Sequence, residues 1–408
     1  MNNFKKLEIN DWKMFQKIEI DFHPQLTILT GANGSGKTTI LNILSRHFGW
    51  NYRELATPAK DKETGVFKFF TRLFKKPIET PDNSIGKIIY SNDSLSNLVL
   101  PQNGNNAQYH VQLKNQQPVQ GLSIPSHRPT YNYRQVSNIP TQKRTRQQAY
   151  QLLFNSYRER YEHGGGQSSN YFIKETLLNW AIGGSGNEFI EADSELKENF
   201  RGFEKVLSKI MPQNIGFKSL TIRNYEIVLV TESGDFMLDA VSGGLSSIID
   251  LAWQIYTQER LKSNTITVLI DEIENHLHAS MQRSILPDLI SAFPNVQFIV
   301  STHSPLVVGS VKESFVHAFR YVDGRVVNEK LDLINKARNA NEVLNEVLGV
   351  SFTMPIWVEN YLNEVVEKYS KVDLTENIFD NLRNELKQVG LEELMPVAIK
   401  QSISKRND

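Results

Sequence analysis

The chain has 408 residues, with 45 lysines and arginines, 45 aspartates and glutamates, and no cysteine. The balanced charge excludes a uniformly polybasic nucleic-acid binder, and the lack of cysteine excludes disulfides, zinc–thiolate sites and thiol nucleophiles. No apolar run reaches the roughly 18 residues that a spanning helix needs, and the N-terminus does not have the pattern of a signal peptide. We therefore expect a cytoplasmic protein without membrane contact.

The spacing of apolar residues predicts an alternation of strands and helices over most of the chain. Strands are expected at 7–22 and 26–29, followed by a glycine-rich loop and a helix at 37–48. The remaining predicted elements are, in chain order, a helix near 66–76, a small antiparallel sheet at 86–125, a helical insertion at 141–212, strands at 215–238, alternating helices and strands at 248–300, and helices at 331–408. This order indicates an α/β fold with a mixed or parallel central sheet.

Residues 31–38 read GANGSGKT and match G-x-x-x-x-G-K-[ST] at every fixed position. Glycines in such a loop let backbone N–H groups approach phosphate oxygens, and the following helix points its positive end at them. We predict that Lys37 reaches the β- and γ-phosphates of ATP and that the Thr38 hydroxyl binds Mg²⁺. The predicted ATP-binding residues lie in this loop and the first helical turn: Asn33, Gly34, Ser35, Gly36, Lys37, Thr38 and Thr39.

An apolar strand ends in two carboxylates, Asp271 and Glu272. Ligands bind at the carboxyl ends of strands in open α/β sheets, so Asp271 is predicted to hold Mg²⁺ together with Thr38. Glu272 is predicted to orient or deprotonate the attacking water. The next strand leads to His303, which is predicted to touch the γ-phosphate. Lys37, Glu272 and His303 are therefore the candidate catalytic residues.

A third motif, Ser242-Gly243-Gly244, opens a predicted helix, which is a further anion-binding geometry. Four motifs occur in the order GANGSGKT, VSGGLSS, VLIDEIENHLH and STHSP. This set resembles the ABC-type ATPase heads of the SMC/RecF/OLD group (OLD, overcoming lysogenization defect), and most of all the stand-alone OLD-like ATPases of bacteria. The resemblance implies a P-loop NTPase head with a small antiparallel β-subdomain, a helical insertion and a C-terminal helical region.

The resemblance also implies a division of the chain and an assembly. The expected parts are 1–140 (first half of the head), 141–212 (helical insertion), 213–330 (second half of the head) and 331–408 (helical region for partner docking). In an ATP-sandwich homodimer, or a higher even oligomer, Ser242, Gly243 and Gly244 of one subunit close on the γ-phosphate held by the other, and His303 matches the switch histidine. The glutamine of the Q-loop stays open among four candidates: Gln112, Gln116, Gln117 and Gln135.

No long heptad pattern, Toprim signature or HNH motif is found in the sequence, so the chain is expected to hydrolyse ATP without cutting nucleic acid itself. The family includes ATPases of anti-phage systems of the Septu, PARIS and retron types, which implies regulation of a separate effector such as an HNH or Toprim nuclease or another toxin. Three alternatives remain open: a RecF-like DNA-repair ATPase, a transporter nucleotide-binding subunit, and a scaffold that uses ATP only to hold a dimer together.

Seven basic residues and one acidic residue lie between 128 and 160, interleaved with tyrosines. Such a stretch either grips nucleic-acid phosphates and stacks on bases or forms a solvated helical face, and both interpretations stay open. The residues that would form a patch for nucleic acid or a partner are Arg128, Arg134, Lys143, Arg144 and Arg146.

Overall fold

The computed structural model describes residues 2–60, 67–70, 83–101, 106–128, 130–163, 168–259, 265–331, 356–370, 376–396 and 398–399. The described residues up to 331 form one compact unit, and those from 356 onward form a second one. The finer division of the chain into four parts stays a prediction.

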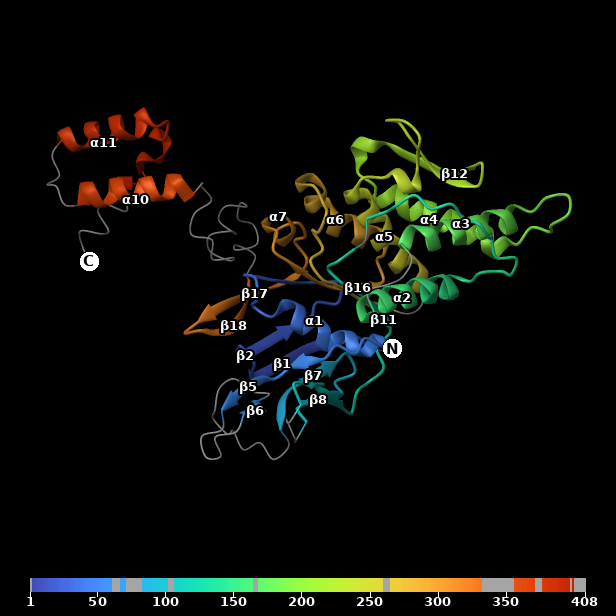
Figure 1. The fold of residues 1–408 in the computed structure, drawn as a ribbon, viewed down its shortest axis with the longest axis horizontal. Helices are drawn as coiled ribbons and strands as arrows, with labels where there is room; N and C mark the ends of the chain where they lie inside the picture. Colours follow the sequence, from blue (N-terminus) through green and yellow to red (C-terminus); the bar gives the residue numbers. More distant parts are fainter. Residues whose placement is uncertain are drawn as a thin grey trace. The chain divides into compact units, whose positions relative to one another are not determined.

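One mixed sheet of 11 strands runs through the first unit, in the order β10-β8-β7-β1-β2-β18-β17-β3-β16-β15-β11 (Figure 1). The strands from β17 through β3, β16 and β15 to β11 are parallel, whereas β10, β8, β7, β1 and β2 are antiparallel to one another. Between these two parts, β18 pairs in parallel with β2 and antiparallel with β17. The predicted α/β fold with a mixed central sheet is confirmed. In chain order the strands are β1 (Phe4–Trp12), β2 (Phe15–Asp21), β3 (Leu26–Gly31), β7 (Ser84–Tyr90), β8 (Leu95–Val99), β10 (Gln112–Lys114), β11 (Gly121–Ile124), β15 (Ile266–Ile270), β16 (Val296–Thr302), β17 (Phe315–Val322) and β18 (Arg325–Lys330).

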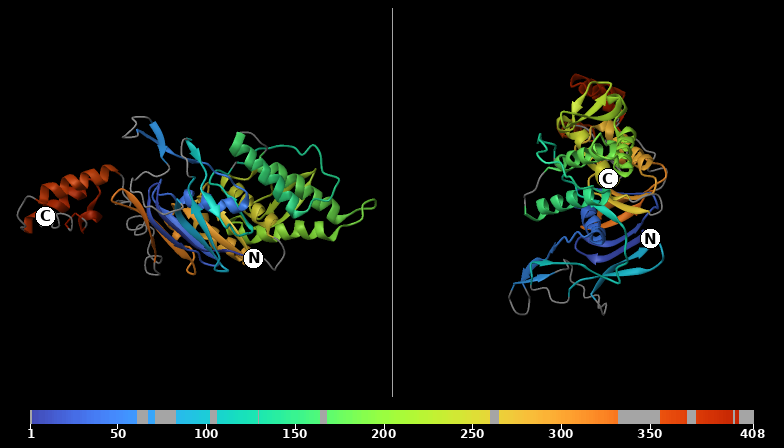
Figure 2. Two further views of the ribbon diagram at one scale, coloured as in Figure 1. Left: turned by 90° about the horizontal axis from the view of Figure 1, so that it is seen from below. Right: turned by 90° about the vertical axis from the view of Figure 1, so that its right-hand side faces the viewer.

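Helices follow the parallel strands, and a helical group lies at 146–210, inside the insertion predicted over 141–212 (Figures 1 and 2). The helices of the first unit are α1 (Lys37–Ser45), α2 (Arg146–His163), α3 (Ser169–Ser185), α4 (Ser194–Ile210), α5 (Gly243–Gln258), α6 (Ala279–Ala292) and α7 (Pro305–Val308), with short turns η1 (Arg46–Phe48), η2 (Gln213–Ile215) and η3 (Leu238–Ala240). The predicted helix at 37–48 is thus α1 followed by η1.

The central strands β3, β15 and β16 are buried along their whole length, as expected for strands covered on both faces. Successive side chains point to opposite faces. Leu269 and Ile299 belong to a cluster with α1, whereas Val268 and Val300 belong to a second cluster with α5 and α6. Each of these strands is therefore covered by one apolar cluster on each face.

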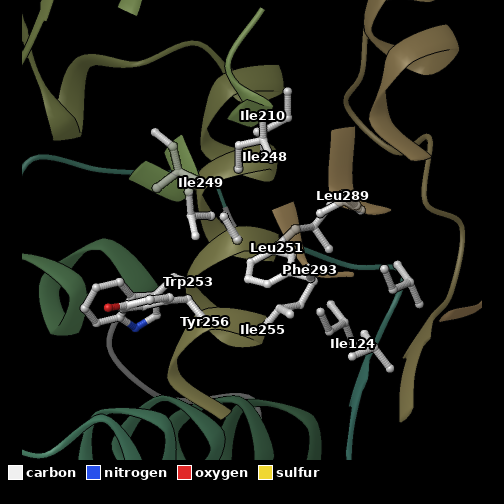
Figure 3. Packing of buried hydrophobic residues seen from close by; sticks show 14 of the residues in the cluster. Ile124, Ile210, Ile248, Ile249, Leu251, Trp253, Ile255, Tyr256, Leu289 and Phe293 are labelled. Carbon is white, nitrogen blue, oxygen red and sulfur yellow. The ribbon is translucent and has the colours of Figure 1, made fainter. Parts of the chain in front are cut away.

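Helix α5 is the centre of the second cluster, and most of its side chains are buried (Figure 3). The ring of Trp253 on α5 lies 5.2 Å from Trp180 on α3 and 4.8 Å from Phe203 on α4, measured between centroids. Asp193 caps α4 by accepting hydrogen bonds from the backbone of Glu195 and Leu196. The helical insertion is thus packed directly on the helix that follows the Ser-Gly-Gly motif.

The antiparallel sheet predicted at 86–125 differs from the structure in two respects. Strands β7, β8 and β10 are antiparallel as predicted, but they continue the large sheet, and β11 pairs in parallel with β15 instead. A separate antiparallel sheet is formed by β12 (Phe217–Arg223), β13 (Glu226–Thr231) and β14 (Phe236–Met237). The described part of the unit also contains two strand pairs: β4 (Glu54–Leu55) with β9 (Gln108–Tyr109), and β5 (Thr57–Lys60) with β6 (Phe67–Phe70).

The helix predicted near 66–76 is wrong where the structure describes it, because 67–70 is strand β6, paired with β5. Phenylalanines near helical spacing also fit a short strand when a partner strand is available. The rest of that predicted helix lies outside the described residues.

The large sheet is curled rather than flat. The side-chain amide of Gln297 on β16 accepts a hydrogen bond from the Phe4 backbone N–H (3.3 Å) and donates one to the Phe4 carbonyl (2.9 Å), although β1 and β16 are not neighbours in the sheet. Leu7 and Ile18 of β1 and β2 share one apolar cluster with Ile40 of α1. The antiparallel strands therefore wrap around α1.

The second unit contains α10 (Ile356–Ser370), α11 (Glu376–Gln388) and the turn η5 (Glu392–Leu394), with a core of its own that includes Leu362, Leu382 and Leu386. These helices fall within the predicted helical region at 331–408, of which 332–355, 371–375, 397 and 400–408 lie outside the described residues. None of the helices described in either unit is long and apolar enough to cross a membrane.

Candidate nucleotide site

The parallel register brings three motifs to one edge of the sheet. Leu29 of β3 lies opposite Ser301 of β16, and Val300 lies opposite Ile270 of β15. The glycine-rich loop, the Asp271-Glu272 pair and His303 follow these strand positions directly, so all three emerge at the carboxyl ends. The three motifs, which the sequence analysis predicted to meet at one site, are thus close in space.

Two glycines of the phosphate loop sit where no other residue fits. Gly31 has φ +141° and faces the backbone of Phe319, and Gly36 has φ +92° and faces the ring of Phe15. Both φ values belong to the region that L side chains rarely adopt. Phe319 of β17 and Phe15 of β2 therefore pack closely against the loop.

Lys37 lies at the centre of the loop and is buried. Its ammonium donates to the carbonyls of Gly31 (2.9 Å) and Ala32 (3.0 Å), and its Nζ lies 3.5 Å from His303 Nδ1. Burial lowers the pKa of Lys37 to about 8, although the nearby carboxylate of Asp271 acts in the opposite direction. Among the other predicted loop residues, Asn33 and Gly34 are exposed, Ser35 is buried, and Thr39 is half-buried.

Asp271 and Thr38 lie side by side. The Thr38 hydroxyl is 3.2 Å from Asp271 Oδ1 and 3.0 Å from Oδ2, and Ser301 Oγ donates to Oδ1 at 2.5 Å. The carboxylate and the threonine hydroxyl present hard oxygen atoms, the ligand type that Mg²⁺ prefers. These two residues therefore fit the predicted magnesium role.

The Glu272 carboxylate is held from two sides. Asn275 Nδ2 donates to Glu272 Oε2 at 2.7 Å, and His303 Nε2 lies 3.8 Å from Oε1. The backbone N–H of His303 donates to Glu274 Oε1 at 2.5 Å. Burial lowers the pKa of His303 below its usual value, and the Lys37 ammonium acts in the same direction. The imidazole is therefore poised as a neutral hydrogen-bonding group.

The Ser-Gly-Gly motif forms the N-terminus of α5. Ser242 is the N-cap and accepts a 3.5 Å hydrogen bond from the backbone of Leu245. A Cβ added at Gly243 would meet nothing within 4 Å, whereas one at Gly244 would lie 3.1 Å from the His276 carbonyl. Within the described residues, no hydrogen bond or ion pair joins this motif to the phosphate loop of the same chain.

The structure does not gather the predicted basic residues into one exposed surface; all five contact other groups, in different parts of the fold. Arg144 pairs with Glu175, Lys143 with Asp193 and Glu195, the Arg134 guanidinium lies over Tyr171, and Arg146 donates to the carbonyls of Tyr256 and Glu259. Arg128 is buried at 4% exposure. Nucleic-acid binding by this stretch stays a prediction.

The choice among the four candidate glutamines of the Q-loop stays open. No hydrogen bond among the described residues joins them to Lys37, Asp271 or Glu272. Gln112 is on the edge strand β10, and Gln117 bonds to Asn115. The residues that sequence reasoning passed over are Ser301, Glu274 and Asn275. All three lie inside the quoted motifs, but only the register of β15 and β16 shows what they contact.

Comparison with known proteins identifies the family to which this chain belongs. A family model described as "AAA domain, putative AbiEii toxin, Type IV TA system" matches residues 26–309, which include all four motifs. The chain belongs to this family. A model of the "P-loop containing region of AAA domain" also matches residues 4–46 of this AAA-domain protein.

Two relatives of this AAA-domain protein carry informative names. A "Septu protein PtuA" from Bacillus thuringiensis is 24% identical over 94% of this chain and 96% of its own length. A "Retron Vc95 probable ATPase" from Vibrio cholerae is 48% identical over 14% of this chain and 11% of its own. The recognition of an ABC-type P-loop ATPase related to Septu and retron proteins is confirmed.

Among solved structures, the SMC head domain from Thermotoga maritima aligns over 81% of this chain and 99% of its own, with 17% identity and a TM-score of 0.42. The fold is assigned from the strand order and the family match, and not from this structural similarity.

Proposed function

We propose that this protein binds MgATP at the cluster of Lys37, Thr38, Asp271, Glu272 and His303 and hydrolyses it to ADP and phosphate. The observation that carries the proposal is the meeting of these five side chains at the carboxyl ends of β3, β15 and β16. Each has the chemistry that phosphoryl transfer to water requires: a cation, two magnesium ligands, an acid–base group and a polar partner for the γ-phosphate.

In this mechanism Lys37 and the N–H groups of the loop bind the β- and γ-phosphates. Bound Mg²⁺ supplies charge neutralisation for the phosphate oxygens, and Thr38 and Asp271 would hold it. Glu272 accepts a proton from the attacking water or orients it through Oε1, because Asn275 already occupies Oε2. His303, neutral and beside both Lys37 and Glu272, donates toward the γ-phosphate.

The test is phosphate release by the purified chain with Mg²⁺ and ATP. Lys37→Ala is expected to abolish nucleotide binding, and Glu272→Gln to lower kcat at least about 100-fold while ATP still binds, because only the water-activating group is lost. Glu232→Gln, whose side chain is 72% exposed, is the matched control and should hydrolyse ATP like the unchanged protein. Phosphate release that survives both site variants contradicts the proposal.

We further propose that two subunits close around ATP, with Ser242, Gly243 and Gly244 of one subunit on the γ-phosphate held by the other. The support is the open space at Gly243 and the lack of any described bond between this motif and the chain's own phosphate loop. Glu272→Gln with ATP should then give a stable dimer, or a higher even oligomer, in light scattering. Gly243→Glu in the same background should remain monomeric. A dimer that forms equally well without ATP contradicts this part.

Finally, we propose that ATP turnover regulates a separate effector, a nuclease or another toxin, in anti-phage defence. The support is the similarity to a Septu protein over nearly the whole chain. Cells that carry the gene with its neighbouring genes should resist phage, and Lys37→Ala should remove the resistance. Hydrolysis that DNA ends stimulate, without any protection, favours the RecF-like alternative instead.

A further inference from the structure

Arg128 is placed beside the candidate catalytic turn by the pairing of two strands. It lies a few residues beyond the end of β11, and Ile124 of β11 lies opposite Ile270 of β15. The backbone N–H of Asp271 donates to the Ile124 carbonyl at 3.0 Å. The segment after β11 therefore leaves the sheet next to Asp271 and Glu272. From there Arg128 turns inward, and its side chain is nearly inaccessible.

The guanidinium of Arg128 joins two elements that carry different motifs. Its Nη2 donates to the carbonyls of Glu272 (2.9 Å), Ile273 (3.2 Å) and Asn275 (3.4 Å). Its Nε donates to Ser247 Oγ on α5 at 2.9 Å. Helix α5 begins at the Ser-Gly-Gly motif, and Ser247 lies in its second turn. One side chain thus bridges that helix and the turn holding Glu272.

The turn that Arg128 contacts has an uncommon backbone conformation at Glu272 itself. Glu272 has φ +47°, which is uncommon for any residue with a side chain. The Glu272 carbonyl also accepts from the Asn275 backbone at 3.0 Å, and the Asn275 amide holds Glu272 Oε2 and donates to the Ser126 carbonyl at 3.1 Å. The direction of the carboxylate therefore depends on the turn as a whole.

Burying a guanidinium is costly, so its surroundings must offset the cost. Burial lowers the pKa of Arg128, while Asp250 on α5, together with Tyr157, Glu274 and Asp271, acts in the opposite direction. The Nη1 atom has no hydrogen-bond partner among the described residues. A methionine would fill similar space without this cost, so the geometry of the donors, rather than packing alone, explains an arginine here.

We infer that Arg128 is a positioning residue that couples helix α5, which begins at the Ser-Gly-Gly motif, to the Glu272 turn, so that engagement of Ser242–Gly244 by a partner's nucleotide sets the direction of the Glu272 carboxylate. This inference rests on the proposed ATP hydrolysis and deepens it. Lysine cannot replace the arginine, because its compact ammonium cannot reach Ser247 and three carbonyls at once.

The experiment compares steady-state ATP hydrolysis, nucleotide affinity and melting temperature in the full chain. Arg128→Lys should lower kcat about tenfold or more and leave KM within about twofold, since ATP contacts are untouched. Tyr157→Phe is the matched control, because it removes a buried 2.5 Å hydrogen bond to Asp250 on the same helix without touching the Glu272 turn. It should lower the melting temperature but not kcat.

A second comparison separates positioning from general loss of structure. Ser247→Ala removes the Arg128 anchor on α5 together with the 3.3 Å hydrogen bond from Ser247 Oγ to the Asn275 carbonyl, and it remains informative if Arg128→Lys fails to fold. It should lower kcat without raising KM. Asn275→Ala combined with Arg128→Lys should cost less than the product of the single effects, because both act through the same carboxylate.

The possible outcomes are distinguishable. Equal kcat in Arg128→Lys and Tyr157→Phe overturns the inference, as does a rise in KM with unchanged kcat, which would mean that Arg128 supports nucleotide binding. Multiplicative effects in the double variant also overturn it. If instead Glu272→Gln hydrolyses ATP normally, the proposed function itself has failed, whatever Arg128 does.

Discussion

Single side chains in this fold have environments that a sequence does not reveal. His317 on β17 is 1% exposed, its Nε2 lies 3.0 Å from the Asp21 carbonyl, and its Nδ1 lies 3.1 Å from the Asn328 amide nitrogen. The neutral ring with hydrogen on Nε2 satisfies both contacts, whereas a second proton on Nδ1 would face the amide donor. Burial accordingly lowers the pKa of His317 to about 4.

This environment predicts a loss of stability in acid. The unfolded chain takes up a proton as the pH falls through about 6.5, but folded His317 does not until the pH reaches about 4, so the free energy of unfolding decreases over that window. At pH 4.5 the decrease from this residue is about 2 kcal/mol. In urea unfolding, His317→Gln should lose correspondingly less stability between pH 7 and 4.5 than the unchanged chain; parallel pH curves would contradict the prediction.

At the scale of elements, the strands that carry the candidate site were the most predictable part. β3, β15 and β16 are short apolar runs that end directly in polar motifs, so both their type and their function are visible locally. The position of β11 was not predictable, because no local pattern says that a strand near β10 in sequence pairs beside β15. Arg128 was consequently assigned to a surface patch, since composition does not distinguish a buried arginine from an exposed one.

The contact of the insertion with α5 leads to a prediction about packing. Trp253 is fully buried between Trp180 and Phe203, so Trp253→Ala should lower the free energy of unfolding by about 3–5 kcal/mol through lost burial and a cavity. Phe189→Ala, at a position 89% exposed in the same unit, is the matched control and should change it by less than about 0.5 kcal/mol. Chemical denaturation followed by circular dichroism measures both; similar losses would mean that α5 is not the core of the unit.

On the scale of the whole molecule, the described residues form three apolar clusters with no buried residue in common, two in the first unit and one in the second. Leu386 is completely buried in the core of the second unit. Leu386→Ala should therefore destabilise that unit by about 2–5 kcal/mol and leave the first unit unchanged. In calorimetry, MgATP should raise only the transition of the first unit, since ligands stabilise the part that binds them.

Val389→Ala, at a position 41% exposed, serves as the control for that experiment. A single transition that shifts as a whole with either the substitution or MgATP would contradict independent unfolding of the two units.

The curl of the large sheet has a consequence for chain length. Strands β10 and β11 lie at opposite edges of the 11-stranded sheet, yet only residues 115–120 connect them. A flat sheet of this width would separate its edges by about 48 Å, whereas the extended connection reaches at most about 25 Å. The short connection thus keeps the sheet rolled around α1. Lengthening it would let the two edges of the sheet move apart and would weaken the packing of the strands against the phosphate loop.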